Sequence, residues 1–194
     1  MRLIKSLILI PAVIIMLLSV AGCHRNSVPV YYMREDVDFS FIKKVAVMPL
    51  QNLTDERYAD EIVRQTVISE LLASGLVDVT IPGEVTAALE KLNIKSDAAL
   101  NPDQIKQIGE MLDVQALVLG SVQQYGEVKS GSVAAPEVTI TLMMADVNTG
   151  TILWSVTETL GGSSFMSRHF GAKSKTMSET VLAVVRKALL TFTE

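Results

Sequence analysis

Two serines and a histidine near the carboxyl-terminal end come closest to the spacing that nucleophilic chemistry needs. Ser163 and Ser164 follow a Gly-Gly pair, and His169 lies shortly beyond them. A serine nucleophile needs a base that takes its proton and a third group that orients the base. The segment holds no acid for that third role. A hydrolase that uses Ser163 or Ser164 with His169 is therefore a distant hypothesis, and a loop or interaction surface is the better interpretation.

A second polar group follows the first predicted strand and consists of Asn52, Thr54, Asp55 and Glu56. Open α/β sheets often bind ligands beyond the carboxyl ends of their strands, so a metal or substrate role is one interpretation. The better one is that Thr54 and the acids satisfy the free N–H groups at a helix start. The motifs GxxxxGK[ST], GxGxxG, HExxH and GxSxG are all missing from the sequence. We therefore predict no catalytic residue, no metal site, no cofactor and no enzymatic activity.

The composition excludes several other classes of function. Seventeen Lys and Arg against 21 Asp and Glu give a net charge of -4, and no run of basic residues forms the stripe that phosphate backbones attract. Nucleic acid is therefore not an expected partner. One cysteine and two histidines cannot build an internal disulfide framework or a His-rich zinc site. The 194 residues suffice for one domain of ordinary size.

The first 22 residues have the organisation of an export signal. Arg2 and Lys5 precede an apolar run over residues 7–18, which is shorter than the roughly 20 residues of a spanning helix. Residues 20–23, Val-Ala-Gly-Cys, look like a bacterial lipobox, in which the cysteine thiol accepts a diacylglyceryl group. A signal anchor with an incidental cysteine is the alternative. Cys23 is the single cysteine of the chain, which favours lipidation, and two acyl chains suffice for stable anchoring.

The predicted domain organisation has three parts: a signal peptide over residues 1–22, a lipidated tether over 23–40 and one α/β domain over 41–194. The tether holds the body close to its membrane, and more closely still if residues 30–40 pack on the domain. In the lipoproteins that this leader resembles, aspartate after the cysteine commonly retains the protein at the inner membrane. His24 stands there instead, so we expect anchoring in the outer membrane, on its periplasmic face.

Hydrophobic periodicity predicts alternating strands and helices in the first half of the body. Residues 44–49 form a short apolar run typical of a buried strand, and residues 77–81 alternate as a second one. A helix between them begins near Asp55 and stops at Gly75. Pro82 opens another helix, and Asn101 with Gln104 caps a third.

The second half of the body is predicted to contain three strands and a helix. Residues 116–122 form a strand, and residues 138–147 and 151–159 form a hairpin with Gly150 at its turn. Alternation places Trp154 on an apolar face, as a core or subunit-interface residue. Thr176 and Glu179 cap a last apolar-striped helix. The order β-α-β-α-α-β-β-β-α predicts a single-domain α/β sandwich with a mixed sheet.

Three segments carry a resemblance to a known group of proteins: residues 45–54, VAVMPLQNLT; residues 116–122, ALVLGSV; and residues 146–155, DVNTGTILWS. In that order they resemble the CsgG-like and TolB N-terminal-like superfamily of envelope lipoproteins over about residues 42–192. The superfamily includes the curli secretion channel, the synthase activator LpoB and the Pel-polysaccharide export lipoprotein PelC. The resemblance implies a non-enzymatic envelope component that works, in several members, as a homo-oligomeric ring.

Departures from these members guide the choice among functions. The curli channel has extra membrane hairpins, but no second pair of long alternating strands is evident here. The synthase activator has a long linker, whereas fewer than 20 residues follow Cys23 before the predicted fold. We therefore place first an oligomeric accessory in the export or assembly of an envelope polymer, an exopolysaccharide or an appendage. The alternative is a lipoprotein regulator that binds a periplasmic peptidoglycan synthase.

The segment from residue 161 to residue 175 is predicted to be a contact surface. It is longer than a minimal connection, and it combines apolar side chains with the main cluster of positive charge in an otherwise acidic body. A lipid headgroup, an acidic partner and the next subunit all fit this chemistry. The alternative is that the aromatic rings anchor the loop to the core. The predicted contact residues are Phe165, Met166, Arg168, Phe170 and Lys173.

Overall fold

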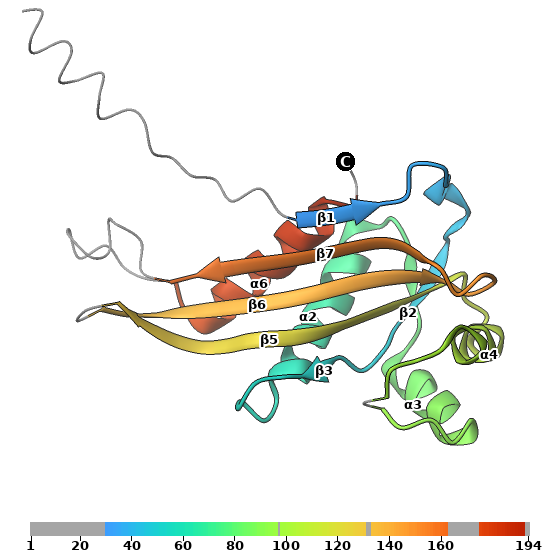
Figure 1. Ribbon diagram of the computed structural model, residues 1–194, viewed down its shortest axis with the longest axis horizontal. Coiled ribbons are helices and arrows are strands. Elements are labelled where there is room, and N and C mark those ends of the chain that lie inside the picture. Colours follow the sequence, from blue (N-terminus) through green and yellow to red (C-terminus); the bar gives the residue numbers. More distant parts are fainter. Residues whose placement is uncertain (1–29, 97, 131–132, 163–174, 193–194) are drawn as a thin grey trace, which may run out of the picture.

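The computed structural model describes residues 30–96, 98–130, 133–162 and 175–192, which form one α/β body around a seven-stranded mixed sheet (Figure 1). The strand order is β1-β7-β6-β5-β2-β4, with the short strand β3 paired to β5. Strands β2, β3 and β4 run parallel to their neighbours, and β1, β5, β6 and β7 form antiparallel pairs. The predicted fold class is confirmed.

The strands are β1 (Val30–Met33), β2 (Lys44–Val47), β3 (Gln51–Asn52), β4 (Asp78–Val79), β5 (Ala116–Ser130), β6 (Val133–Asp146) and β7 (Ile152–Gly161). The helices are a 3₁₀ turn η1 (Phe39–Phe41), α2 (Ala59–Ser74), α3 (Pro82–Lys91), α4 (Pro102–Leu112) and α6 (Met177–Leu190). The predicted order of elements is present, with β1, η1 and β3 in addition.

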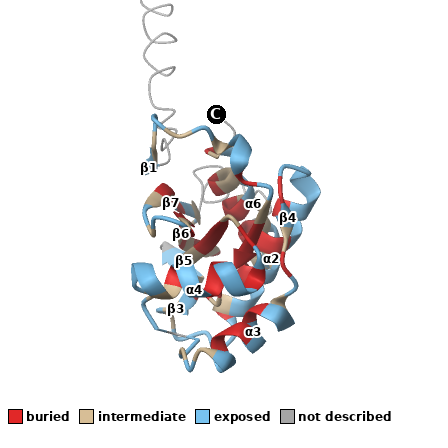
Figure 2. Cartoon of the chain, turned by 90° about the vertical axis from the view of Figure 1, so that its right-hand side faces the viewer, coloured by how far each residue is buried: buried red, intermediate tan, exposed pale blue. Residues whose placement is uncertain are grey.

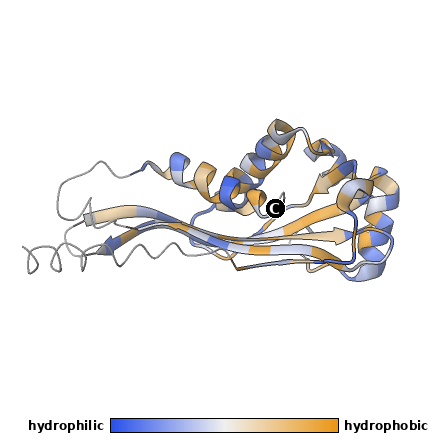
Figure 3. Ribbon diagram, turned by 90° about the horizontal axis from the view of Figure 1, so that it is seen from above, coloured by the Kyte–Doolittle hydropathy of each residue, from blue (hydrophilic) through white to orange (hydrophobic). Residues whose placement is uncertain are grey.

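The two faces of the sheet are covered to different extents. Helices α2 and α6 pack along one face, over a core that includes Val45, Val118 and Trp154 (Figure 3). Helices α3 and α4 pack on the opposite face, over Ala46 and Leu117, at the end where β2 meets β5. Successive residues of a strand point to opposite faces, so the apolar run of β2 contributes side chains to the cores on both faces of the sheet. Beyond that end, none of the described helices covers the second face.

Polar caps and special backbone positions set several element boundaries as predicted. The Asn101 and Thr176 side chains each accept the backbone N–H of the residue three positions on, and Gln104 and Glu179 bond back to complete two capping boxes. Gly75 ends α2 in the left-handed conformation. Trp154 is fully buried, and its indole Nε1 donates to Thr191 Oγ1 at 3.0 Å. The prediction of Trp154 as a core residue is confirmed.

Three boundaries differ from the sequence-based expectation. Strand β1 lies inside the range predicted for the tether, residues 23–40. Because β1 pairs with β7, this part of the range packs on the domain and the free tether is shorter. Helix α2 begins at Ala59, after a loop that Asn52 and Thr54 organise. Strand β5 continues to Ser130, past the predicted end at residue 122, and pairs with β6 along its whole length.

Candidate functional site

The polar group after β2 folds a loop and leaves no free ligand set. Asn52 Nδ2 donates to the carbonyl of Glu56 at 2.8 Å, and Asn52 Oδ1 accepts the N–H and hydroxyl of Thr54 at 3.0 and 2.8 Å. Thr54 Oγ1 in turn accepts the N–H of Glu56. Helix α2 itself begins at Ala59, and the N-cap residue Tyr58 supplies no side-chain cap. These bonds organise the loop before α2, so the expectation that Thr54 and the acids cap the helix was wrong.

Buried charges in the described body are also structural. Arg64 donates from Nε and Nη2 to the carbonyl oxygen of Val47, at 3.1 and 2.9 Å, where β2 ends. Glu158 is buried between β7 and α6, and its Oε1 accepts a bond from Lys187 Nζ at 2.6 Å. Across the described ranges, no three His, Cys, Asp or Glu side chains are grouped so that they could hold a metal ion. These charges tie helices to the sheet and do not converge on a hollow.

The face of the sheet opposite α2 and α6 presents a field of hydroxyl groups, which we call the open face. Thr141 Oγ1 lies 2.8 Å from Thr157 Oγ1 on the neighbouring strand, and Thr139 Oγ1 lies 2.9 Å from Thr159 Oγ1. Gln123 Nε2 donates to Thr141 Oγ1 at 3.1 Å. The cross-strand bonds hold these side chains in fixed positions. The open face comprises Val30, Tyr32, Ser121, Gln123, Gln124, Thr139, Thr141, Ser155, Thr157 and Thr159.

The edge of the open face is formed by β1. The register pairs Tyr32 with Ser155 and Val30 with Thr157, so the Tyr32 side chain extends from the same side of the sheet as the threonines. Its exposed ring and the exposed Val30 side chain add apolar contact groups to a surface that carries mainly hydroxyls and amides. Glu137 lies beyond Thr139 on the same side of β6. The open face is therefore a polar surface with little charge, and cross-strand bonds fix the positions of its threonine side chains.

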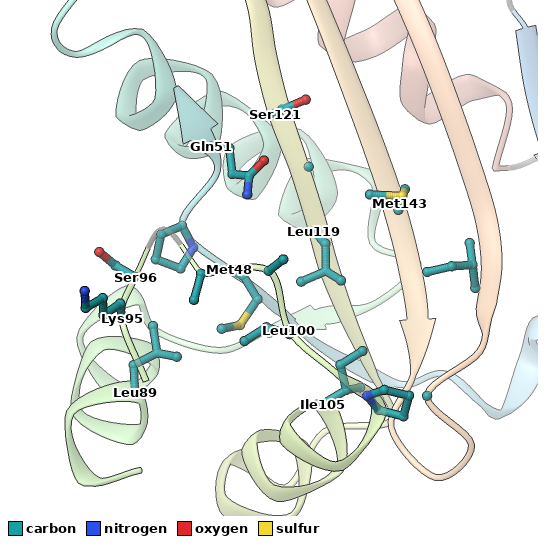
Figure 4. A pocket seen from close by; sticks show the side chains of 17 residues that line it. Met48, Gln51, Leu89, Lys95, Ser96, Leu100, Ile105, Leu119, Ser121 and Met143 are labelled. Carbon is teal, nitrogen blue, oxygen red and sulfur yellow. The ribbon is translucent and has the colours of Figure 1, made fainter. Parts of the chain in front are cut away.

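A cavity of about 320 Å³ lies where the open face meets α3 and α4 (Figure 4). Leu119 and Met143 come from the neighbouring strands β5 and β6, and Leu89, Leu100 and Ile105 come from the helical side. Met48 and Gln51 line it from the segment after β2, so it lies beyond the carboxyl end of a parallel strand, as expected for an open α/β sheet. Its apolar walls fit an apolar group of a partner or ligand.

Polar groups stand around the apolar walls of the cavity. Ser121 lies on β5, and the exposed side chains of Lys95 and Ser96 lie on the connection after α3. This set offers hydroxyl groups and one ammonium group to whatever occupies the hollow. Among the described residues that line the cavity, an acid, a base and a nucleophile are not brought together.

The predicted site residues of the sequence lie elsewhere. Cys23, and the contact residues Phe165, Met166, Arg168, Phe170 and Lys173, lie outside the described residues, as do Ser163, Ser164 and His169. Their roles stay predictions. The open face was missed, although its signal is in the sequence: Thr139 and Thr141, and again Thr157 and Thr159, occupy the positions that alternate with the apolar residues of the two hairpin strands.

The strands that build this surface fall within a family match. The model of a family described as "Peptidoglycan-synthase activator LpoB" matches residues 28–159. This chain belongs to the LpoB family. The match runs from just before β1 to Thr159 in β7 and so includes every residue of the open face. It supports the synthase regulator, our alternative interpretation, better than the export accessory that we had placed first.

Solved structures share the fold of this LpoB-family protein. A PelC dodecamer from Paraburkholderia phytofirmans is 22% identical, with 84% of this chain and 96% of that chain covered and a TM-score of 0.58. Lipoprotein GNA1162 from Neisseria meningitidis is 14% identical, with 77% and 99% covered and a TM-score of 0.56.

The LpoB C-terminal domain from Salmonella enterica is 19% identical, with 61% and 82% covered and a TM-score of 0.46. No curated protein matched in a sequence comparison. The wider CsgG-like and TolB N-terminal-like placement is not confirmed by these comparisons and stays a prediction.

Proposed function

We propose that this protein is a non-enzymatic lipoprotein regulator that binds a periplasmic peptidoglycan synthase. The observation that carries the proposal is the family match, because it spans β1 to β7 and stops before α6. We further propose that acylated Cys23 anchors the protein to the periplasmic face of the outer membrane. Within the described ranges, no helix combines the length and apolar content needed to cross a membrane.

The open face and the adjoining cavity are the proposed contact surface for the synthase. Protein interfaces combine a few anchor side chains in pockets with a surrounding area of complementary polar contacts. The cavity offers the pocket, between Leu119, Met143 and Ile105. The threonine pairs offer the surrounding hydrogen-bonding area. Because cross-strand bonds already hold these side chains, they lose less conformational entropy when a partner binds.

The proposal is tested by binding and by synthase activity. The lipidated chain is titrated against purified peptidoglycan synthases of the same cell, and the rate of glycan polymerisation is followed. We expect Thr157→Arg, in the centre of the open face, to weaken binding at least about tenfold and to reduce activation, because a long charged side chain blocks close approach. Thr86→Arg is the matched control, because Thr86 is an exposed threonine on α3 outside the open face. Equal binding by both variants would reject the open face, and no binding by the wild type would reject the proposed function.

An oligomeric accessory in polymer export is the second candidate, and the short tether favours it. Residues 24–29 alone separate Cys23 from β1, so an anchored body stays near the membrane, where an export assembly would also lie. We propose homo-oligomerisation as part of this candidate only. The solution mass of the mature body separates the two candidates, because a ring is several times heavier than a monomer.

A further inference from the structure

Exposed apolar side chains gather at the end of the body from which the tether leaves. Figure 2 places β1 and the C-terminus toward this end and α3 toward the other. Four large side chains here, which we call the tether-side patch, are 40–61% exposed: Tyr31, Phe41, Leu76 and Leu190. Single exposed apolar residues are ordinary, but several on one surface indicate a contact with something apolar.

Surface hollows join most of these side chains into one area. Tyr31 and Tyr32 line a first hollow with Phe39, and Phe39 lines a second one with Leu76 and Phe192. Leu76 and Phe192 also line a third, together with Leu190. The ring of Phe192 packs edge-on against Phe39 at 5.4 Å and against Trp154 at 5.9 Å. The patch is therefore continuous and rests on the fixed aromatic core.

The length of the tether determines which part of the body can reach the membrane. Seven steps along the chain separate Cys23 from Val30, and a fully extended chain covers about 3.6 Å per step, or about 25 Å in total. Acyl chains on Cys23 would hold Val30 within that distance of the lipid surface. The end that carries Val30 must then face the membrane, and this end carries the tether-side patch.

Charges around the patch are nearly balanced. Arg34 is paired with Asp36 at 2.8 Å and Arg186 with Glu70 at 2.6 Å, and the remaining groups are Lys43, Glu35 and Asp38. Among the described residues, three cations face four carboxylates, so attraction of these groups to anionic lipid does not drive binding at this surface. Apolar insertion can drive binding, because Leu side chains gain by leaving water and Tyr rings suit the interface between headgroups and acyl chains.

We propose that the tether-side patch docks on the lipid surface that the anchor reaches. The docking fixes the orientation of the body, with β1 and the ends of α2 and α6 at the membrane and α3 pointing away. The open face then stands across the membrane plane, accessible to a partner from the side. The docking depends on the proposed anchor at Cys23. The experiment below distinguishes failure of the docking from failure of the anchor.

The test reads the depth of single labelled positions in the anchored protein. Acylation blocks Cys23, so a new cysteine carries the only reactive thiol of the mature chain. Lipidated Leu190→Cys and Met111→Cys, the latter an exposed position on α4, are labelled with an environment-sensitive fluorophore and reconstituted in vesicles of phosphatidylethanolamine and phosphatidylglycerol. We expect the label at 190 to emit at shorter wavelength and to be quenched by nitroxide-labelled lipid. We expect the label at 111 to do neither.

A second substitution tests the patch itself. Leu76→Glu should abolish most of the quenching at position 190, whereas Ile81→Glu, at an even more exposed apolar position before α3, should leave it unchanged. Vesicles without phosphatidylglycerol should give the same quenching. A label at 190 that reports water in floating vesicles would overturn the docking, and so would a shifted emission that lipid does not quench, because protein would then cover the patch. Failure of the protein to float with vesicles would overturn the anchor, and with it the docking.

Discussion

Trp154 is the side chain on which the core between the sheet and α6 most depends. It is fully buried, its indole N–H is paired with Thr191, and its ring packs against Phe192. Trp154→Ala removes these contacts and leaves a cavity, so we expect a loss of about 3–5 kcal/mol in the free energy of unfolding. Urea or thermal denaturation of the mature body measures this loss in the free energy of unfolding.

A companion variant separates the hydrogen bond from the packing. Thr191→Val leaves the buried indole N–H without its acceptor at nearly constant volume, which should cost about 1–3 kcal/mol. A Trp154→Ala variant that melts within a few degrees of the wild type would show that the side chain is not a core residue in solution. The sequence made this residue predictable because it alternates with Val156 across the less apolar Ser155. The expectation that Ile152 shares its face was wrong, because a register shift between Ile152 and Trp154 turns Ile152 toward the core on the opposite face of the sheet.

At the scale of elements, the turn between β6 and β7 depends on Gly150. Its φ is +67°, and a Cβ atom there would lie 2.6 Å from the Cβ of Pro102 at the start of α4. Gly150→Ala therefore combines backbone strain with a collision, and we expect a loss of about 1–3 kcal/mol in unfolding free energy. Gly126→Ala is the control, because a Cβ there meets nothing within 4 Å. Equal stability of the two variants would contradict the packing of this turn against α4.

The elements that the sequence predicted are those with local signals. Asn101 with Gln104, and Thr176 with Glu179, cap helices through bonds between near neighbours. Strand β1 and the second half of β5 have no such signal. The residues after Val122 lack regular apolar alternation, and they become a strand because β6 pairs with them. β1 depends on β7, more than 100 residues away in the chain. The open face shares this dependence, because its hydroxyl pairs join residues on different strands.

For the whole molecule, the proposed lipid anchor at Cys23 would decide where the body works. Cys23→Ser removes the acyl acceptor, so we expect the variant to leave the membrane fraction, since the tether-side patch alone is too small for stable attachment. Fractionation of cells that express the variant measures the change, with His24→Ser as a neighbouring control that keeps the thiol. A Cys23→Ser protein that still sediments with the outer membrane after a salt wash would favour the signal-anchor interpretation.

Because the proposed tether leads directly into β1, a pull between membrane and partner would act on this strand first. Force along the strand loads its pairs with β7, from Val30–Thr157 to Met33–Trp154, all at once, whereas force across it peels them apart in succession. Release of β1 would free the chain up to η1, nine residues from Val30 to Asp38, and add about 30 Å of reach. The sheet would keep β7 as its new edge. Under tension, β1 would therefore detach from the sheet and lengthen the short tether. The body could then reach a partner that lies farther from the membrane.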